Sequence, residues 1–359
     1  MQKHAPPRLC ANCTYRRTLA LMRNETALNK IHENICPFYS ANQTNANAMR
    51  KILIYFSLVL FIYSCGNDDI SSPEKKELKS EKEVLKEIIS PDFLTRVDNK
   101  LIISSSQSDS MLYVYSLPDL KYLNRTGKKG RGPGEIPFFP MFCESMNRTL
   151  YVWGYGPKTI GKFDINQNGE LKVNDTIKLP IYEAFNNMHI LNDSLFIYYL
   201  PDDLRIVKFD LKNKRYLDNI QLKKDNHNES FYYSNRGIIA ANDSFVVFAY
   251  LFKKEINIYR LNDFKLHKVI KGDYEYKKPI VGSSDNPKYY TQIVAGENFF
   301  YALCKNDKSM EVYDYDGTFV NEFTFDITPS LFAVDENNKT IYGFANDNKY
   351  EPYLLRIRF

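Results

Sequence analysis

The stretch "NDSLFIYYLPDDLRIVKFDL", residues 192–211, contains two short apolar runs, each introduced by a turn rich in Asn, Asp or Pro. Residues of this kind end strands, and apolar runs of four to eight residues between such turns are typical of β-strands. Leu195 follows the first turn, and Phe209 lies 14 residues later, in the second run. We used these two positions as markers in a search for repeats.

The same pair of markers occurs six times along the chain. The first marker is found at Leu101, Leu150, Leu195, Phe245, Phe299 and Ile341, with separations of 49, 45, 50, 54 and 42 residues. The second marker follows 13 or 14 residues later each time, at Tyr115, Phe163, Phe209, Tyr259, Tyr313 and Leu355. Short strands repeated at this period are typical of propeller blades. We therefore predict an all-β fold, a six-bladed β-propeller with four-stranded antiparallel blades.

The last unit lacks a strand that the others contain. In units one to five a further strand-like run follows the second marker, whereas unit six stops at Phe359. A blade without its outer strand would leave an unpaired sheet edge. We predict that "EVLKEIIS", residues 83–90, supplies this N-terminal strand and closes the ring, so that the propeller spans residues 83–359.

The segment "MRKILIYFSLVLFIYSC" begins at Met49. Two cations precede eleven apolar or small residues, which is the arrangement of a secretory signal peptide and is shorter than the roughly 20 residues of a membrane span. Residues 62–65 resemble a bacterial lipobox, in which the cysteine is acylated. We predict a signal peptide at 49–64, lipidation at Cys65 and a non-native upstream extension at residues 1–48; a buried N-terminal helix of a cytosolic protein is the alternative.

The segment after the cysteine is polar, charged and free of aromatic residues. Such a composition does not bury enough apolar surface to fold, so we predict a flexible tether at residues 65–82. The membrane is then contacted through the lipid anchor only. Gly66 provides no inner-membrane retention signal of the aspartate type, and we expect an outer-membrane lipoprotein that faces the periplasm or the cell surface.

The positive charge of the chain is concentrated in its leader. The net charge is +5, but residues 1–64 hold eight Lys or Arg and two Asp or Glu, and the other 295 residues hold 40 cations and 41 anions. A general nucleic-acid binder needs a concentrated basic face. We therefore expect no nucleic-acid partner.

The glycine-rich stretch "GKKGRGPGEIP", residues 127–137, lies between units one and two. It lacks the Gly-Lys-Ser/Thr ending of a phosphate-binding loop, and no helix pattern follows it. Its glycines are expected to turn the chain. The string "GRGPGE", residues 130–135, at the start of the second blade of an acylated, Tyr-rich chain resembles the TolB-like six-bladed β-propeller lipoproteins of Bacteroidota. This resemblance covers roughly residues 85–359 and implies an envelope propeller without agreed catalytic residues.

The residues that carry metal and acid–base chemistry are scattered. The histidines after Cys65 are His189, His227 and His267, on three different units, and no hydrolase or metalloprotease motif is present. An upstream set, Cys10, Cys13, His32 and Cys36, has zinc-like spacing but precedes the export signal and lacks apolar periodicity. We therefore predict no metal, no cofactor and no catalytic residues.

The candidate binding residues are Arg131 and Glu135 in the glycine-rich stretch, and Trp153 and Tyr155 in "YVWGYGPKT". An exposed aromatic pair there would stack on a sugar or anchor a peptide, whereas packing of Trp153 between blades is the alternative that the sequence favours. We predict a lipid-anchored, non-catalytic binding module for a protein, peptide or carbohydrate. The alternative is a propeller hydrolase or lyase acting on carbohydrate or peptide, which three or more polar side chains converging on the central channel would favour.

Overall fold

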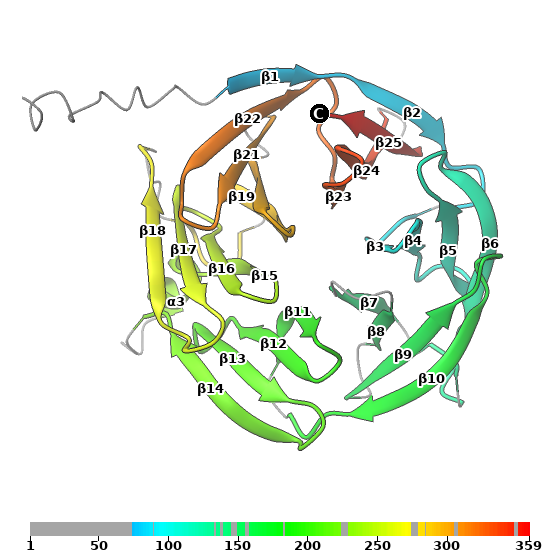
Figure 1. Ribbon diagram of the computed structural model, residues 1–359, viewed down its shortest axis with the longest axis horizontal. Helices are drawn as coiled ribbons and strands as arrows, with labels where there is room; N and C mark the ends of the chain where they lie inside the picture. Colours follow the sequence, from blue (N-terminus) through cyan, green and yellow to red (C-terminus); the bar gives the residue numbers. More distant parts are fainter. Residues whose placement is uncertain are drawn as a thin grey trace, which may run out of the picture. The chain divides into compact units, whose positions relative to one another are not determined.

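The strands form six sheets that are arranged in a ring, and each sheet is one blade of a β-propeller (Figure 1). This computed structural model describes residues 74–359, except residues 89, 133, 137–138, 145–148, 155–157, 182–183, 224–228, 274–278, 284, 305–307 and 348–350. Within the described residues, every blade has four antiparallel strands, so the predicted fold class is confirmed.

Blades 1 to 5 are built in chain order from the innermost strand to the outermost. Blade 1 contains β3 (Phe93–Val97), β4 (Lys100–Ser104), β5 (Ser110–Ser116) and β6 (Lys121–Lys128). Blade 2 contains β7 (Pro140–Cys143), β8 (Leu150–Gly154), β9 (Thr159–Ile165) and β10 (Leu171–Lys178). Blade 3 contains β11 (Asn186–Leu191), β12 (Leu195–Leu200), β13 (Arg205–Asp210) and β14 (Arg215–Gln221).

Blades 4, 5 and 6 continue the ring. Blade 4 contains β15 (Gly237–Ala241), β16 (Phe245–Tyr250), β17 (Glu255–Arg260) and β18 (Leu266–Lys271). Blade 5 contains β19 (Tyr290–Ala295), β20 (Phe299–Cys304), β21 (Ser309–Asp314) and β22 (Phe319–Phe325). Blade 6 contains β23 (Leu331–Asp335), β24 (Thr340–Asn346) and β25 (Pro352–Arg358). A short helix, α3 (Glu229–Ser234), precedes blade 4.

The N-terminal strands β1 (Glu74–Leu78) and β2 (Ser80–Val84) join the last two blades. β2 pairs antiparallel with β25 as the outer strand of blade 6, and β1 pairs parallel with β22 as a fifth strand of blade 5. The ring is therefore closed by an N-terminal strand as predicted, but at 80–84 instead of 83–90. Residues 74–78 and 80–82, which were predicted as part of the tether, lie in strands.

Two apolar residues of the predicted closing stretch pack in the core instead of pairing in the closing strand. Leu85 and Ile88 are buried in the cluster between blades 6 and 1. The strand that does pair, "SEKEV", is mostly exposed and charged, because an outermost strand has no further strand to cover it. Charged side chains on such an edge also disfavour pairing with another chain.

The core consists of six hydrophobic clusters, one between each pair of neighbouring blades in the described structure. The second strand of a blade is apolar on both faces because each face is covered by another blade; β4 and β8 are buried along their whole length. The repeat markers lie on the second and third strands, and Leu101 pairs directly with Tyr115, as Leu150 does with Phe163. In blades 3, 4 and 5 the first marker pairs with the residue after the second marker. The spacing of 13 or 14 residues is kept because the loop between the second and third strands has four or five residues in every blade.

Among the residues that the structure describes, no helix has both the length and the apolar character needed to span a membrane.

Candidate functional site

The innermost strands of the six blades surround a central channel that contains two cavities. Residues 291–293 of β19 line the smaller cavity, and residues 294–297 line the larger one. The channel therefore follows the inner strands from their starts to their ends. Glu144 and Leu94 line both cavities and mark the junction between them.

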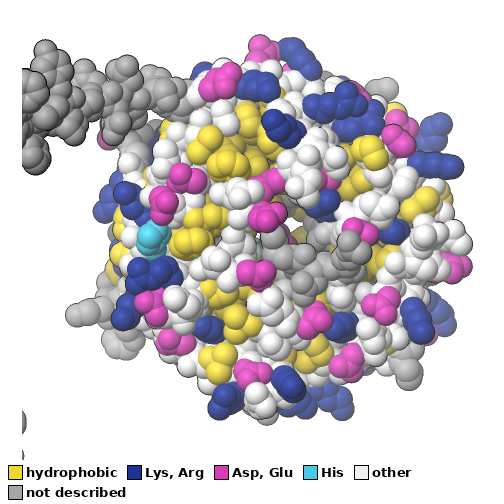
Figure 2. Space-filling view, viewed as in Figure 1, with side chains coloured by type: hydrophobic (Ala, Val, Ile, Leu, Met, Phe, Trp, Pro, Cys, Tyr) yellow, Lys and Arg dark blue, Asp and Glu magenta, His cyan; other side chains and the backbone are white. Residues whose placement is uncertain are grey.

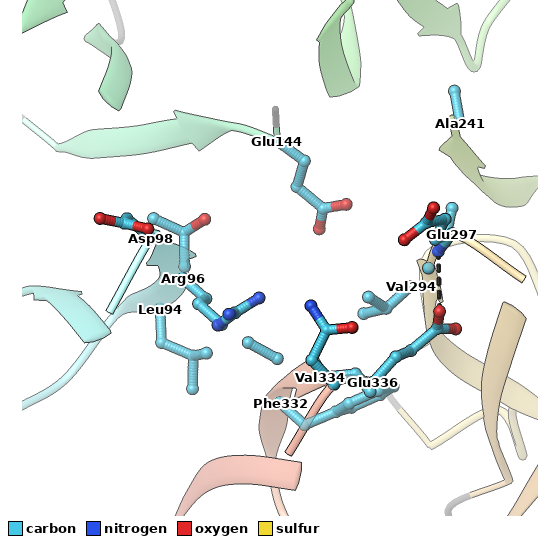
Figure 3. A pocket seen from close by; sticks show the side chains of 15 residues that line it. Leu94, Arg96, Asp98, Glu144, Ala241, Val294, Glu297, Phe332, Val334 and Glu336 are labelled. Carbon is cyan, nitrogen blue, oxygen red and sulfur yellow. Dashed lines mark hydrogen bonds between the residues drawn. The ribbon is translucent and has the colours of Figure 1, made fainter. Parts of the chain in front are cut away.

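The larger cavity, of about 310 Å³, is rich in charged side chains that come from different blades. Its charged lining consists of Arg96, Asp98, Glu144, Glu297 and Glu336. Figure 3 shows Glu144 projecting into the cavity from the end of β7, with Arg96 on one side and Glu336 on the other. Several Asp and Glu side chains border the central opening on the face in view in Figure 2. This end of the channel is acidic.

Arg96 joins blade 1 to blade 6. Its Nη2 lies 3.0 Å from Oδ2 of Asp335, a residue that is only 2% exposed. Asp335 also accepts hydrogen bonds from the backbone and side-chain nitrogens of Asn338. The single guanidinium among the described lining residues is thus already neutralised by a buried carboxylate.

Glu336 joins blade 6 to blade 5. Its carboxylate accepts hydrogen bonds from the backbone N–H groups of residues 297, 298 and 299, at 3.0–3.2 Å, and from the Tyr301 hydroxyl. The turn approaches so closely that a Cβ at Gly296 would collide with the Glu336 carboxylate. Glu336 therefore holds the turn after β19 and has little capacity left for a ligand.

Glu144 is held by the backbone and not by its carboxylate. Its N–H donates to Met188 O at 2.8 Å, and its carbonyl accepts from Ile190 N at 2.9 Å, which ties the inner strands of blades 2 and 3 together. The side chain retains 41% of its exposed surface, but this surface faces a channel walled by protein. Loss of solvent there raises the pKa of the Glu144 carboxyl to about 7.

His189 lies directly behind Glu144. Its Nε2 is 3.2 Å from Ile239 O, and a carbonyl oxygen only accepts, so Nε2 carries the hydrogen. Burial lowers the pKa of His189 to about 4, so the ring is neutral near pH 7. Its Nδ1 lone pair faces Glu144 Oε2 at 3.5 Å. A protonated Glu144 can donate to this lone pair, whereas a carboxylate is repelled by it.

The smaller cavity is mainly apolar. Its walls include Phe93, Phe142, Met188, Ile238 and Ile293. Gln292 bridges two of the inner strands there, because its amide exchanges two hydrogen bonds with the backbone of Phe332, at 2.8 and 2.9 Å. The channel therefore changes from apolar to acidic along its length, with Glu144 at the boundary.

The predicted binding residues of the glycine-rich stretch lie outside the channel. The Glu135 carboxylate accepts from Gly132 N at 2.9 Å and contacts Lys128 Nζ at 3.0 Å, which together lower its pKa. A Cβ at Gly130 would collide with this carboxylate. Glu135 thus organises its own loop, and Arg131 is exposed on it.

Trp153 is 8% exposed and packs against Phe185, with ring centroids 5.3 Å apart, in the cluster between blades 2 and 3. Tyr155 and Cys65 lie outside the described residues, as do the upstream extension, the signal peptide and the zinc-like set. The interior location of Trp153 corresponds to the packing alternative that the sequence left open.

Sequence reasoning missed Glu144, Arg96 and Asp335, and it noted His189 only as an isolated histidine. These residues are far apart in the chain and meet because the inner strands of different blades do. The repeat pattern does indicate where each inner strand ends, and acidic residues at those ends are the signal that could have found the site. No group of three or more His, Cys, Asp or Glu suited to a metal ion occurs among the described residues.

Comparison with known proteins supports the fold described above. No protein-family model and no curated protein matches the chain in sequence. A solved structure from Bacteroides fragilis, of a protein described as presumed to be exported, is similar with a TM-score of 0.52 and 14% sequence identity. The match covers 80% of this chain and 99% of that chain. At this identity the similarity shows a common fold.

Proposed function

We propose that this protein is exported, is anchored to the envelope through a lipid on Cys65, and acts as a binding module. The signal-peptide pattern from Met49 and the cysteine after it support this location. The resemblance of residues 130–135 to TolB-like lipoproteins implies the same location, and the similarity in fold to a protein described as presumed to be exported agrees with it. Palmitate labelling tests the anchor: the wild type incorporates label and Cys65→Ala does not, whereas equal labelling of both would refute it.

The ligand of the proposed module carries a positive charge and binds in the larger cavity. The observation that supports this most is the charge of the lining, in which Asp98, Glu144, Glu297 and Glu336 face one guanidinium that Asp335 already neutralises. Opposite charge in a narrow, protein-walled cavity attracts a ligand and orients it. The volume of about 310 Å³ is at the small end of ligand pockets, which suits an amine or one basic side chain.

Titration calorimetry with spermidine and with a lysine-containing tripeptide tests this proposal. We expect binding that weakens as salt is added, and at least a tenfold loss of affinity in the double variant Glu144→Gln, Glu297→Gln. A matched glutamate-containing tripeptide is expected not to bind. Equal binding of the acidic and basic peptides, or unchanged affinity in the double variant, would contradict a site for cations.

The second candidate function is that of a propeller enzyme, and the raised pKa of Glu144 favours it. Polar side chains do converge on the channel, and a carboxyl group with a pKa near 7 is suited to general acid–base catalysis. Of the lining carboxylates, Glu336 is however occupied in holding a turn, and the guanidinium of Arg96 is paired with the buried Asp335. Hydrolysis of aryl glycosides or aminoacyl anilides that is abolished by Glu144→Gln would favour the enzyme over the binding module.

A further inference from the structure

A third pocket, of about 500 Å³, lies outside the channel on the other face of the ring. It is lined by Asp202, Glu229, Tyr232, Tyr233, Arg236 and Val281. Asp202 belongs to the turn between β12 and β13, and the other residues precede the inner strands of blades 4 and 5. Inner strands start on this face and end at the acidic cavity, so the two sites are separated by the length of the channel.

The polar wall of this pocket is preorganised. Arg236 Nη2 lies 2.7 Å from Asp202 Oδ1, and the guanidinium is stacked over the Tyr233 ring, 5.3 Å from its centroid. The Tyr233 ring in turn stacks on Phe252, with centroids 5.5 Å apart. The cation and the carboxylate are thus presented side by side in a fixed orientation, and Asp202 remains 72% exposed.

The loop opposite this wall is also fixed. Asn286 accepts a hydrogen bond from Ile280 N at 2.8 Å and donates to the oxygens of Ile280 and Ser283 at 2.6 and 3.0 Å. Asn286 also donates to the Tyr233 hydroxyl, which joins the loop to the wall. Val281, held at the tip of this loop, is 37% exposed and gives the pocket an apolar side.

The chemistry of the pocket excludes most ligand classes. A phosphate or another anion needs cations in excess, but Arg236 is paired with Asp202, and Glu229 lies nearby. A cation would meet the Arg236 guanidinium in the same wall. A purely apolar ligand would take the Arg236–Asp202 pair and Glu229 out of water without offering them any hydrogen bond, which costs free energy.

We propose that this pocket binds a neutral saccharide. A guanidinium beside a carboxylate matches two neighbouring hydroxyls of a sugar, since one hydroxyl accepts from Arg236 while the other donates to Asp202. The apolar C–H face of a pyranose ring fits against tyrosine and aliphatic side chains, here Tyr232 and Val281. The pocket is open at the surface, so one sugar unit of a longer chain can occupy it.

Calorimetry with the purified protein and four neutral hexasaccharides, derived from cellulose, xylan, mannan and starch, tests the proposal. We expect at least one of them to bind, with at least a tenfold loss of affinity in Tyr232→Ala and in Asp202→Asn. Tyr216→Ala is the matched control, because this tyrosine is 54% exposed on β14 and outside the pocket. Thermal unfolding shows whether each variant is folded.

The channel variant Glu144→Gln separates this proposal from the proposed cation site, since it is expected to leave saccharide binding unchanged. Saccharide binding that is lost in Glu144→Gln, or that persists in both Tyr232→Ala and Asp202→Asn, would overturn the assignment of this pocket. It would be overturned as well if none of the four hexasaccharides bound, or if a basic peptide bound there in their place.

Discussion

Glu144 and Glu311 are two glutamates in the interior of the propeller, but they differ in the number of donors around them. The Glu311 carboxylate is surrounded by hydrogen-bond donors between blades 4 and 5, and the residue is 4% exposed. Glu144 faces a cavity, and within the described residues its polar side-chain neighbour is the neutral His189. The number of donors therefore distinguishes a carboxylate that holds blades together from one that is available to a ligand.

The donors around Glu311 come from both blades. Its oxygens lie 2.9 Å from Lys254 Nζ and 3.1, 2.8 and 3.0 Å from the hydroxyls of Tyr289, Tyr290 and Tyr313. Burial, and then the charge of Glu311, raise the pKa of Tyr290 and Tyr313 far above their ordinary value, so these hydroxyls remain protonated donors. A buried charge with this many partners is stable only while the set is complete.

The largest effect is expected for Glu311→Ala, which leaves Lys254 and three buried hydroxyls without their acceptor. Loss of one member of a buried ionic set typically costs about 3–5 kcal/mol, so we expect a decrease of that size in the free energy of unfolding, measured with urea. Glu77→Ala is the control, since its pair with Lys79 is exposed on both sides and such pairs contribute little to stability. Equal losses in the two variants would contradict a structural role of the Glu311 set.

A smaller effect is expected for Lys254→Met, which removes the cation and keeps the three tyrosine hydroxyls. Burial lowers the pKa of Lys254, but the hydrogen bond and charge of Glu311 outweigh it and raise the pKa. A hydrogen bond to a charged group contributes about 1.5–3 kcal/mol, and the partial exposure of Lys254 places the expected loss of unfolding free energy at the lower end. A loss as large as that of Glu311→Ala would show that the tyrosines alone do not satisfy the carboxylate.

The same comparison shows what a single sequence can predict. The markers identified the blades because the second strands are largely buried on both faces and a loop of four or five residues joins each of them to the third strand. The outer strand β1 was missed and β2 was predicted about three residues too far along the chain, because water covers both and "EKKEL" and "SEKEV" carry no apolar pattern. Their pairing with β22 and β25 is a property of the closed ring, which residues 74–84 do not encode locally.

The sites were less predictable than the fold. Glu311 lies in "MEVYDY", two residues before the second marker of unit five, Tyr313. Nothing in that string shows that the carboxylate meets tyrosines from the start of β19. Glu144 and His189 meet only because blades 2 and 3 are neighbours. Conversely, the compact string "GRGPGE" attracted a functional interpretation, although its glycines make room for the Glu135 side chain. A local motif identifies local structure, whereas these sites are assembled from distant residues.

The smallest change in unfolding free energy is expected for a substitution of Glu144, and this change depends on pH. The folded protein raises the pKa of this carboxyl from 4.5 to about 7, so the stability that it contributes is complete below about pH 4.5 and is lost as the pH rises through about 7. The pKa of His189 is lowered from 6.5 to about 4, so its contribution is present above about pH 6.5 and is lost as the pH falls through about 4. The two groups together favour stability at mildly acidic pH.

Glu144→Gln replaces the protonated carboxyl with a neutral group of the same shape. We expect the variant and the wild type to have equal unfolding free energies near pH 5, and the variant to be more stable at pH 8. Water in the channel screens the charge of Glu144 and so reduces the size of this gain. Urea unfolding at pH 5, 6, 7 and 8 measures this difference, and Glu322→Gln shows how much of it follows from the loss of any one negative charge. If the difference in unfolding free energy stays constant between pH 5 and 8, Glu144 is as well solvated or as well paired as a surface carboxylate. The contrast between Glu144 and Glu311 would then lie in their packing and not in the number of hydrogen-bond donors around them.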